Sequence, residues 1–183
     1  MSLDGGKMKR ELKGYFERFT DVWQKFNNSY PKVAWDESLK PIMYIGEPDK
    51  EQYISWQPIE KNEISDLGEI EHKFGIHIHD SIKQYFNSYW FAELKGYYNS
   101  YNIILEPVLP GRELDNVYAQ ISGYYLNHGD LNNIPIGFEG VNNFYIVIDN
   151  NSGQVKLEDY ERNEFFLLAE SLEELISGIK FNS

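Results

Sequence analysis

The sequence predicts a single α+β domain in which a mostly antiparallel central sheet is flanked by N-terminal, middle and C-terminal helices. Three observations carry this prediction. Apolar residues recur at helical spacing at both ends and in the middle of the chain. Short runs of aromatic and β-branched residues lie between these segments and are bounded by Gly, Pro and Asn. A chain of 183 residues with no internal repeat and no linker-like composition fits one folded unit.

The N-terminal segment has the clearest helical pattern. One helical face carries its apolar residues over about five turns, namely Leu12, Tyr15, Phe16, Phe19, Val22, Trp23 and Phe26. Pro31 marks the end of this helix, because proline disfavours helical backbone at the preceding residue. Residues 32–41 are expected to form a loop. We place the domain at residues 8–181 and expect residues 1–7 to be disordered or derived from an expression vector.

Two short strands and two short helices are expected next. The strands are Ile42–Ile45 and Tyr53–Trp56, which a turn rich in Gly, Pro and Asp separates. The first helix covers Asp66–Phe74, and Gly75 follows it in the position of a C-cap. Asp80 is the expected N-cap of the second helix, whose apolar face carries Ile82, Tyr85, Phe86 and Tyr89.

The second half of the chain again alternates between strands and a helix. Strands are expected over Phe91–Gly96 and Tyr101–Glu106, and apolar residues at 3.6 spacing predict a helix over 114–127. The run Phe144–Ile148 is rich in β-branched residues. The turn sequence Asp149–Gly153 should join this run to the next apolar residues as a hairpin.

The chain ends in a further strand and a terminal helix. The strand is expected over Phe165–Leu168. Ser171–Glu174 has the pattern of a capping box, in which the first side chain and the fourth satisfy backbone N–H groups at a helix start. The residues expected to face inward are Leu172, Leu175, Ile176 and Ile179.

The charge is strongly acidic and unevenly distributed. The chain holds 17 basic and 29 acidic residues, for a net charge of −12, which argues against binding to nucleic acid or directly to anionic lipid. Residues 47–71 hold eight acids and two lysines, and residues 158–174 hold seven acids and one arginine, so each stretch has a net charge of −6. Two solvated polar faces, or an acidic surface for a basic protein partner, would explain this pattern.

Composition also limits the compartment. The chain has no cysteine, which excludes a disulfide scaffold, thiolate metal sites and a cysteine nucleophile. No apolar run approaches the ~20 residues that a membrane span needs. We therefore expect a cytoplasmic protein that reaches a membrane only through a protein partner. The oligomeric state is left open.

No motif indicates a catalytic site, a metal site or a cofactor. The nucleophile-elbow, phosphate-loop and dinucleotide-binding patterns are all missing from the sequence. His72, His77 and His79 could hold a divalent metal together with Asp80 or Glu71, but solvated or hydrogen-bonded histidines are the simpler interpretation. An enzyme remains a third hypothesis, whose only motives are abundant carboxylates and these histidines.

Aromatic residues are numerous enough to suggest a protein-binding surface. The chain has 14 Tyr and 4 Trp, residue types that are favoured at protein interfaces because they bury a large area at low entropic cost. Core packing is the alternative for each of them. The side chains that are hardest to bury all at once are Trp56, Tyr97, Tyr98, Tyr101, Tyr124 and Tyr125.

Several segments, taken in order, match the pattern of a known family. They are Phe19–Trp23, Tyr53–Pro58, Ile70–Phe74, Ile134–Gly137, Ser152–Val155 and Leu167–Ile176. The run Trp56-Gln57-Pro58 and the strand–helix ending are the most specific. Over residues 8–181 the chain resembles the Syd family, within the SUKH superfamily of bacterial immunity and scaffold domains.

This resemblance implies a non-catalytic domain with an acidic concave surface. Members of the Syd family dock on basic cytosolic loops of the SecY translocon channel, whereas SUKH relatives often neutralise toxins by binding them. The resemblance therefore implies a basic partner, and a location in the cytoplasm or at the cytoplasmic face of the inner or plasma membrane. It places the groove and its charge contacts at Trp56, Glu60, Glu63, Asp66, Glu69 and Glu71. The second acidic stretch is a departure that could place the negative surface elsewhere.

Overall fold

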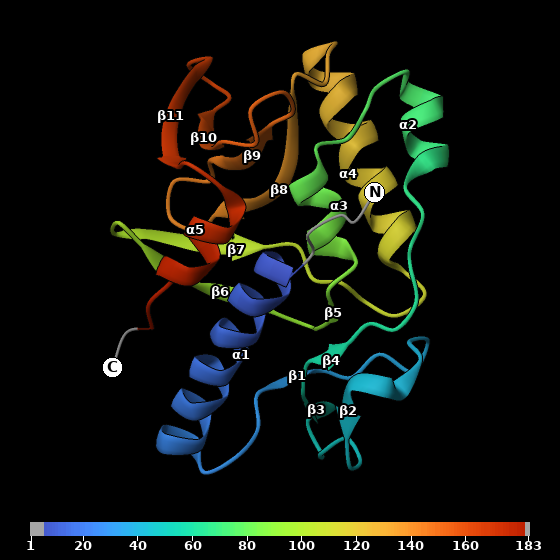
Figure 1. Ribbon diagram of the computed structural model, residues 1–183. Helices are drawn as coiled ribbons and strands as arrows, with labels where there is room; N and C mark the ends of the chain where they lie inside the picture. Colours follow the sequence, from blue (N-terminus) through green and yellow to red (C-terminus); the bar gives the residue numbers. More distant parts are fainter. Residues whose placement is uncertain (1–5, 182–183) are drawn as a thin grey trace.

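Six antiparallel strands form the central sheet, in the order β11-β10-β9-β8-β7-β6 (Figure 1). The computed structural model describes residues 6–181. The strands are β6 (Leu94–Tyr98), β7 (Tyr101–Leu105), β8 (Asn133–Glu139), β9 (Tyr145–Asp149), β10 (Val155–Asp159) and β11 (Glu164–Ala169). Together with the helices around it, this sheet confirms the predicted α+β fold.

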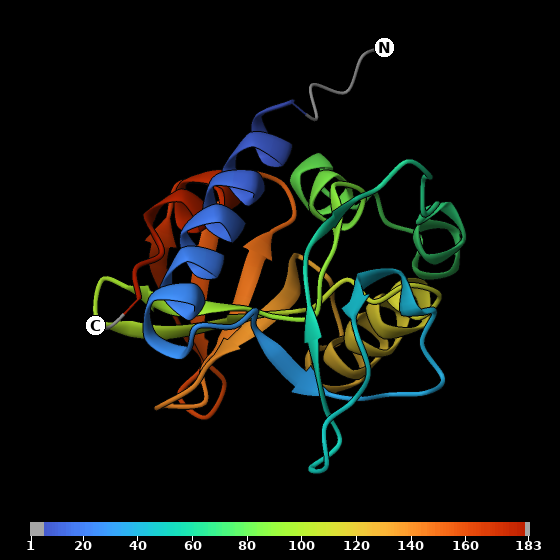
Figure 2. The same ribbon diagram turned by 90° about the horizontal axis from the view of Figure 1, so that it is seen from below.

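Helices lie on both sides of the sheet. They are α1 (Gly6–Asn27), α2 (Gly68–Phe74), α3 (Asp80–Phe86), α4 (Glu113–His128) and α5 (Leu172–Gly178). Figure 2 shows α1 and α4 on opposite sides of the molecule. The first turn of α1 includes Gly6 and Lys7, and the other residues of the expected N-terminal tail, 1–5, lie outside the described part of the chain.

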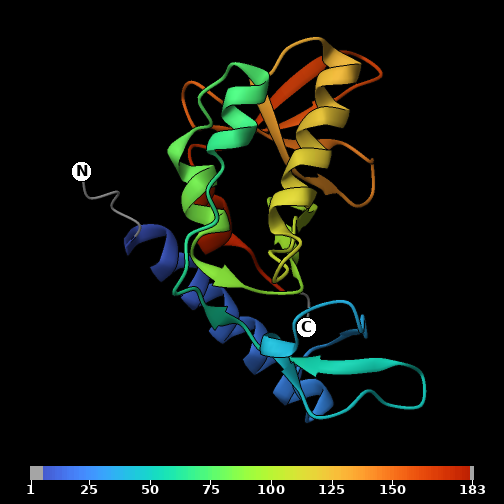
Figure 3. The same ribbon diagram turned by 90° about the vertical axis from the view of Figure 1, so that its right-hand side faces the viewer.

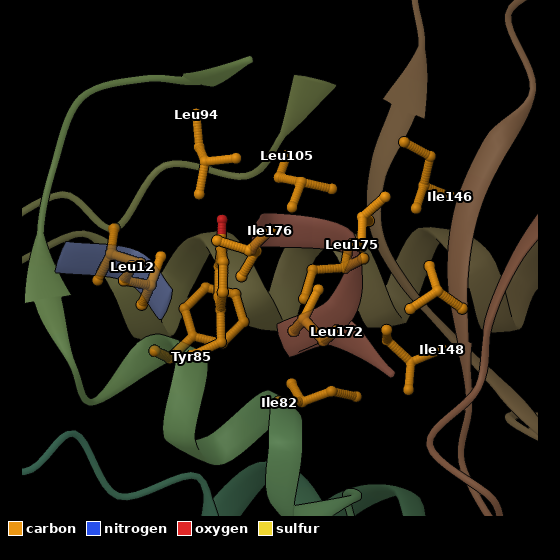
Figure 4. Packing of buried hydrophobic residues seen from close by; sticks show 14 of the residues in the cluster. Leu12, Ile82, Tyr85, Leu94, Leu105, Ile146, Ile148, Leu172, Leu175 and Ile176 are labelled. Atoms are coloured by element: carbon orange, nitrogen blue, oxygen red, sulfur yellow. The ribbon is translucent and has the colours of Figure 1, made fainter. Parts of the chain in front are cut away.

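Strand β9 is buried from both sides by these helices. Ile146 and Ile148 belong to the cluster that includes the apolar side chains of α5 (Figure 4). On the other face, the ring centroid of Tyr145 lies 6.0 Å from that of Tyr124 on α4. A strand that is covered on both faces is apolar at successive positions, which explains the continuous run Phe144–Ile148.

The first and last helices pack against each other beside the sheet. The ring of Phe181, just after α5, lies with its centroid 5.5 Å from that of Tyr15 and 5.6 Å from that of Phe19. The Tyr15 hydroxyl donates to the carbonyl of Lys95 at 2.9 Å and accepts from its N–H at 2.8 Å. This pair of hydrogen bonds fixes α1 to strand β6, and burial raises the pKa of the Tyr15 hydroxyl well above its usual value.

The apolar face of α1 is confirmed except at its C-terminal end. The buried residues of this helix are Met8, Leu12, Tyr15, Phe16 and Phe19. Trp23 is partly buried against the core. Phe26 is 56% exposed, so its predicted inward position is wrong. The last turns of α1 extend past β6 and the rest of the sheet (Figure 1), which leaves Phe26 no core to enter.

The segment predicted as a loop after α1 contains a strand. Strand β1 (Lys32–Ala34) pairs with β3 (Tyr53–Trp56), and the bounds of β3 agree with the prediction. The predicted strand Ile42–Ile45 is wrong in its first half, because Pro41–Met43 forms a 3₁₀ turn. Proline favours the first position of a helical turn, where its fixed φ is already suitable. Only β2 (Tyr44–Ile45) is extended.

The two short helices are confirmed, with one error at a cap. Gly75 follows α2 in a left-handed conformation, with φ of 64°. The N-cap of α3 is His79, whose Nδ1 accepts from the N–H of Ser81 at 3.2 Å, so the predicted cap at Asp80 is wrong by one position. Tyr89 lies beyond the helix in β5 (Tyr89–Trp90), which pairs with β4 (Ile59–Glu60).

The C-terminal half follows the prediction with smaller differences. The expected strand Phe91–Gly96 is interrupted, because Phe91 forms an isolated bridge with Val108 and β6 begins at Leu94. The β9–β10 hairpin is present, and Pro135 is accommodated in β8 at a bulge. The N-cap half of the capping box is confirmed, since the Oγ atom of Ser171 accepts from the N–H of Glu174 at 3.1 Å, whereas the Oε2 atom of Glu174 accepts from the N–H of Glu170 at 2.8 Å and not from that of Ser171.

The β9–β10 turn is attached to the segment that precedes α3. The Oδ1 atom of Asn150 accepts from the N–H of His79 at 2.8 Å, and its Nδ2 atom donates to the carbonyl of His77 at 2.7 Å. Gly153 has φ of 78°, and a Cβ atom there would lie 2.4 Å from the Cε1 atom of His79. The turn and the start of α3 therefore form one contact that requires glycine.

A comparison of two glycines should isolate this contact. Gly153 and Gly129 both have φ of 78°, but nothing lies within 4 Å of a Cβ atom built at Gly129. We expect Gly129→Ala to lower the free energy of unfolding by about 1 kcal/mol through backbone strain alone. Gly153→Ala should lower it by about 1–3 kcal/mol more, because His79 must move. Equal losses in urea unfolding would contradict the contact.

A second pair of substitutions should test the packing of α1. Phe19 is 4% exposed and Phe26 is 56% exposed on the same helix. We expect Phe19→Ala to lower the free energy of unfolding by about 3–5 kcal/mol through lost burial and a cavity. Phe26→Ala should change it by less than about 0.5 kcal/mol. Similar losses for the two variants in urea unfolding would mean that the buried face of α1 is assigned wrongly.

Candidate functional site

The segment from β4 to α2, residues 60–71, is called the acidic segment here. It runs along the outer side of α3 (Figure 3). Its buried side chains are Lys61, Ser65, Leu67 and Ile70. Its exposed acids are Glu60, Glu63, Asp66 and Glu69, and Glu71 is half-buried. The buried residues hold the backbone, and the acids between them therefore face outward.

Lys61 is the central anchor of the acidic segment. Its Nζ atom donates to the Oγ atom of Ser65 at 2.6 Å and to the carbonyl of Phe86 at 3.0 Å. The ammonium also lies 3.8 Å from the ring centroid of Trp90, as a cation–π contact. Burial lowers the pKa of Lys61, and the nearby carboxylates of Glu113 and Glu63 act in the opposite direction.

Ser65 extends this anchor to two helices. Its Oγ atom donates to the Oε1 atom of Glu113 on α4 at 2.7 Å. Its N–H donates to the Oδ1 atom of Asn87, just after α3, at 2.7 Å, and its carbonyl accepts from the Nδ2 atom of Asn87 at 3.2 Å. Buried polar groups are stable only when hydrogen-bonded, so these contacts fix the position of the acidic segment.

Two of the predicted acids already form ion pairs within the molecule. Glu60 forms an ion pair with Lys9 on α1 at 2.9 Å. Glu71 lies 2.6 Å from Lys83 on α3, and its Oε1 atom accepts from the N–H of Ile78 at 2.7 Å. Burial alone would raise the pKa of Glu71, but these hydrogen bonds outweigh it and hold the pKa below its usual 4.5.

The other three acids form the free face of the acidic segment. Within residues 6–181, Glu63, Asp66 and Glu69 form no ion pair. The Oδ1 atom of Asp66 accepts from the N–H of Gly68 at 2.8 Å, which shapes the entry into α2. Ile64, between the first two acids, is 85% exposed. The free face is therefore defined by three exposed carboxylates without an ion-pair partner among residues 6–181 and by one exposed apolar side chain.

Trp56 does not belong to this surface. Its side chain is fully buried, with ring centroids 6.4 Å from Phe16 and 6.1 Å from Phe19 on α1. The predicted partner contact at Trp56 therefore needs correction, because an indole inside the core cannot touch a partner. The residue packs β3 against α1 and so supports the chain that leads into the acidic segment.

The hollow next to the acidic segment is not an acidic groove. It has a volume of about 460 Å³, and its charged lining residues are Lys9, Lys61, Lys83 and Glu63. Glu60, Asp66, Glu69 and Glu71 are outside this lining. The acidic concave surface implied by the resemblance does not coincide with this hollow, because Glu63 is the one acid among its lining residues and three lysines accompany it.

The three clustered histidines are placed separately. His79 caps α3, and the Nδ1 atom of His77 lies 3.2 Å from the Oε1 atom of Glu71. His72 is exposed on α2. Within the described residues, no three His, Asp or Glu side chains gather in an arrangement that could hold a metal ion.

The second acidic stretch, residues 158–174, is partly internal. Glu158 is buried and is hydrogen-bonded to His128 and to the hydroxyl of Tyr124, both on α4. Asp159 is also buried, and its Oδ2 atom lies 3.7 Å from the Nε atom of Arg162. The exposed acids of this stretch are Glu161, Glu164, Glu170 and Glu174.

Lys61 and Ile64 were not among the residues predicted for the site. For Lys61 a signal does exist, because a strand alternates its side chains between two faces. Glu60 lies between Ile59 and Lys61. If Ile59 points inward and Glu60 outward, the alternation predicts that Lys61 points inward again. For Ile64 the sequence offers only an apolar residue among polar ones, which does not distinguish a buried anchor from an exposed contact.

No helix in the described part of the chain combines the length and the apolar character that crossing a membrane requires.

Comparison with known proteins shows extended similarity to one family. The sequence model of the family described as Syd protein (SUKH-2) matches residues 9–180. Protein Syd of Psychromonas ingrahamii is 26% identical over 172 residues, which cover 92% of this chain and 93% of that protein. Protein Syd of Aliivibrio salmonicida is 21% identical over 176 residues, covering 94% and 96%. Protein Syd of Shewanella frigidimarina is 22% identical over 171 residues, covering 92% and 78%.

The ion pairs of Glu71 lead to a prediction about stability and pH. The carboxylate has a lowered pKa in the folded protein, so its stabilising effect is present above pH 4.5 and is lost as the pH falls through the folded-state pKa. We expect Glu71→Gln to lower the free energy of unfolding by about 1–2 kcal/mol at pH 7. The difference from the unsubstituted protein should shrink below pH 4.5.

Glu69→Gln, two residues away and exposed, is the matched control. Its effect should stay below about 0.5 kcal/mol at every pH in the same urea titrations. A loss for Glu71→Gln that does not change with pH would contradict the proposed role of the carboxylate charge.

Proposed function

Because the chain belongs to the Syd family, we propose that it is a non-catalytic binding domain that docks on basic cytosolic loops of the SecY translocon channel. The family match extends over residues 9–180, so the proposal concerns nearly the whole chain. The observation that carries it is the free face of the acidic segment. Glu63, Asp66 and Glu69 point outward there without an ion-pair partner within residues 6–181.

The chemistry of this face suits a cationic polypeptide. Cytosolic loops of membrane proteins carry an excess of Lys and Arg, which three carboxylates without ion-pair partners among residues 6–181 can bind. Ile64, which is 85% exposed, adds apolar area next to Glu63. Binding of this kind needs no bond to be made or broken.

Attachment through charge has consequences for location and kinetics. A chain with a net charge of −12 is repelled by anionic lipid, so we propose a cytoplasmic protein that reaches the membrane surface through its protein partner. Complementary charges accelerate association and are screened by salt, with a Debye length of about 8 Å at physiological ionic strength. Docking should therefore weaken as salt is added.

Charge reversal on the free face provides the test. We expect Glu63→Lys combined with Glu69→Lys to abolish sedimentation with SecY-containing vesicles, whereas the unsubstituted protein sediments with them at low salt. Glu17→Lys combined with Asp21→Lys on α1 changes the net charge equally at two other exposed acids, so it serves as the control. This control variant should still bind.

Two outcomes would contradict the proposal. Equal sedimentation of the unsubstituted protein with vesicles that lack SecY would assign the binding to lipid. Equal binding by the Glu63→Lys, Glu69→Lys variant would mean that the acidic segment is not the docking surface. Urea unfolding of each variant should remain within about 0.5 kcal/mol per substitution of the original value, because these side chains are exposed.

The term SUKH-2 in the description of the matching family supports a second candidate function. In it, the same acidic face binds and neutralises a basic toxin domain. Co-expression with the toxin of a neighbouring gene would separate the two candidates. Neutralisation would be favoured if the unsubstituted protein restores growth and the Glu63→Lys, Glu69→Lys variant does not. If the toxin remains toxic in the presence of the unsubstituted protein, neutralisation of that toxin is excluded.

A further inference from the structure

The two edges of the six-stranded sheet differ in how they are covered. At β6, the N–H of Tyr97 donates to the carbonyl of Lys180 at 2.8 Å, and the N–H of Lys180 donates to the carbonyl of Tyr97 at 2.8 Å. The C-terminal segment thus covers that edge. Strand β11 is the opposite edge, and no strand within residues 6–181 pairs with its outer side (Figure 1).

The uncovered edge is apolar. Phe165 is 41% exposed, Phe166 is 44% exposed and Leu167 is 56% exposed. Every second residue of an edge strand also directs its N–H and C=O groups away from the sheet, where another strand can pair with them. Proteins commonly protect such edges with lysine, proline or a β-bulge; β11 contains neither lysine nor proline, and the one irregularity in its pairing with β10 lies at its end, between Leu167 and Ala169. This edge therefore has the features of a strand-pairing site.

The charge around β11 defines which chain could occupy it. Glu161 and Glu164 are exposed at its start, and Glu170 and Glu174 are exposed after its end. The stretch 158–174 contains a single basic residue, Arg162. An occupant that matches this edge would carry apolar residues at its centre and Lys or Arg on both sides of them.

We propose that β11 is a second docking edge, which binds an extended polypeptide with an apolar centre and basic flanks as an additional strand of the sheet. A second copy of this chain is a poor occupant, because antiparallel self-pairing would place Glu164 of one copy near Glu170 of the other. In Figure 1, β11 and α2 lie at opposite sides of the molecule, so this edge is separate from the acidic segment.

A synthetic peptide provides a direct test with the intact protein. The probe is fluorescein-labelled Arg-Lys-Val-Thr-Val-Thr-Val-Lys-Arg, and its binding is followed by fluorescence anisotropy. Two further versions carry N-methyl groups on alternate residues, one set for each edge of the peptide. Because each lost backbone hydrogen bond costs about 0.5–1.5 kcal/mol, at least one methylated version should bind about tenfold or more weakly.

Variants of the protein locate the site. Phe165→Thr combined with Leu167→Thr removes exposed apolar area while keeping residues that favour strands, and should weaken binding about tenfold. Glu164→Gln combined with Glu170→Gln should weaken binding and reduce its dependence on salt. Leu126→Gln on α4 is the control, because it removes an apolar side chain that is 83% exposed and lies away from β11. This variant should bind the probe as tightly as the unsubstituted protein.

The outcomes distinguish this edge from the acidic segment and from self-association. The variant Glu63→Lys with Glu69→Lys should bind the probe like the unsubstituted protein. The proposal would be overturned if both methylated probes bind as tightly as the unmodified probe. It would also be overturned if the Phe165→Thr, Leu167→Thr variant binds the probe as tightly as the unsubstituted protein. A different result would assign the edge to a second copy of the chain. In that case the unsubstituted protein does not bind the probe and sediments as a dimer, and the Phe165→Thr, Leu167→Thr variant sediments as a monomer.

Discussion

A buried positive charge fixes the candidate binding surface. Lys61 is almost fully buried at the wall of the hollow, where its ammonium is stable only with well-placed hydrogen-bond acceptors. It finds them in Ser65 and in the carbonyl of Phe86. Ser65 in turn reaches α4 through Glu113, and Asn87 holds its backbone beside α3. The free acids of the segment therefore project from a fixed backbone, so that a partner needs to order only their side chains.

The sequence allowed part of this surface to be predicted. Charge counts identified the acid-rich stretch, and the resemblance singled out its residues. Neither could distinguish acids that form ion pairs within the protein from acids that form none. Glu60 and Glu71 are held by Lys9 and Lys83, which are distant in sequence and adjacent only in the fold. Trp56 was misplaced because an aromatic residue in a short strand is equally compatible with a core and with an interface.

The fold was predictable where a local signal agrees with the tertiary contacts. The capping box at Ser171, the left-handed Gly75 and the β9–β10 hairpin all combine a turn or cap residue with a periodic apolar pattern. The errors fall where elements are short. Strand β1 has three residues and is stabilised by its pairing with β3, which no local pattern reveals. Phe26 fits the helical period, but the sheet ends before it.

The contact of α1 with α5 and Phe181 has a consequence for the order of folding. Helix α1 completes its packing only against residues from the other end of the described chain, which are synthesised much later than the helix itself. Phe16 and Phe19 can pack on Trp56 earlier, but until Phe181 is in place the contact of Tyr15 and Phe19 with it is missing, and this side of α1 is exposed to transient association. We therefore expect this domain to complete its fold in one late cooperative step, and chains that stop before α5 to be prone to aggregation and degradation.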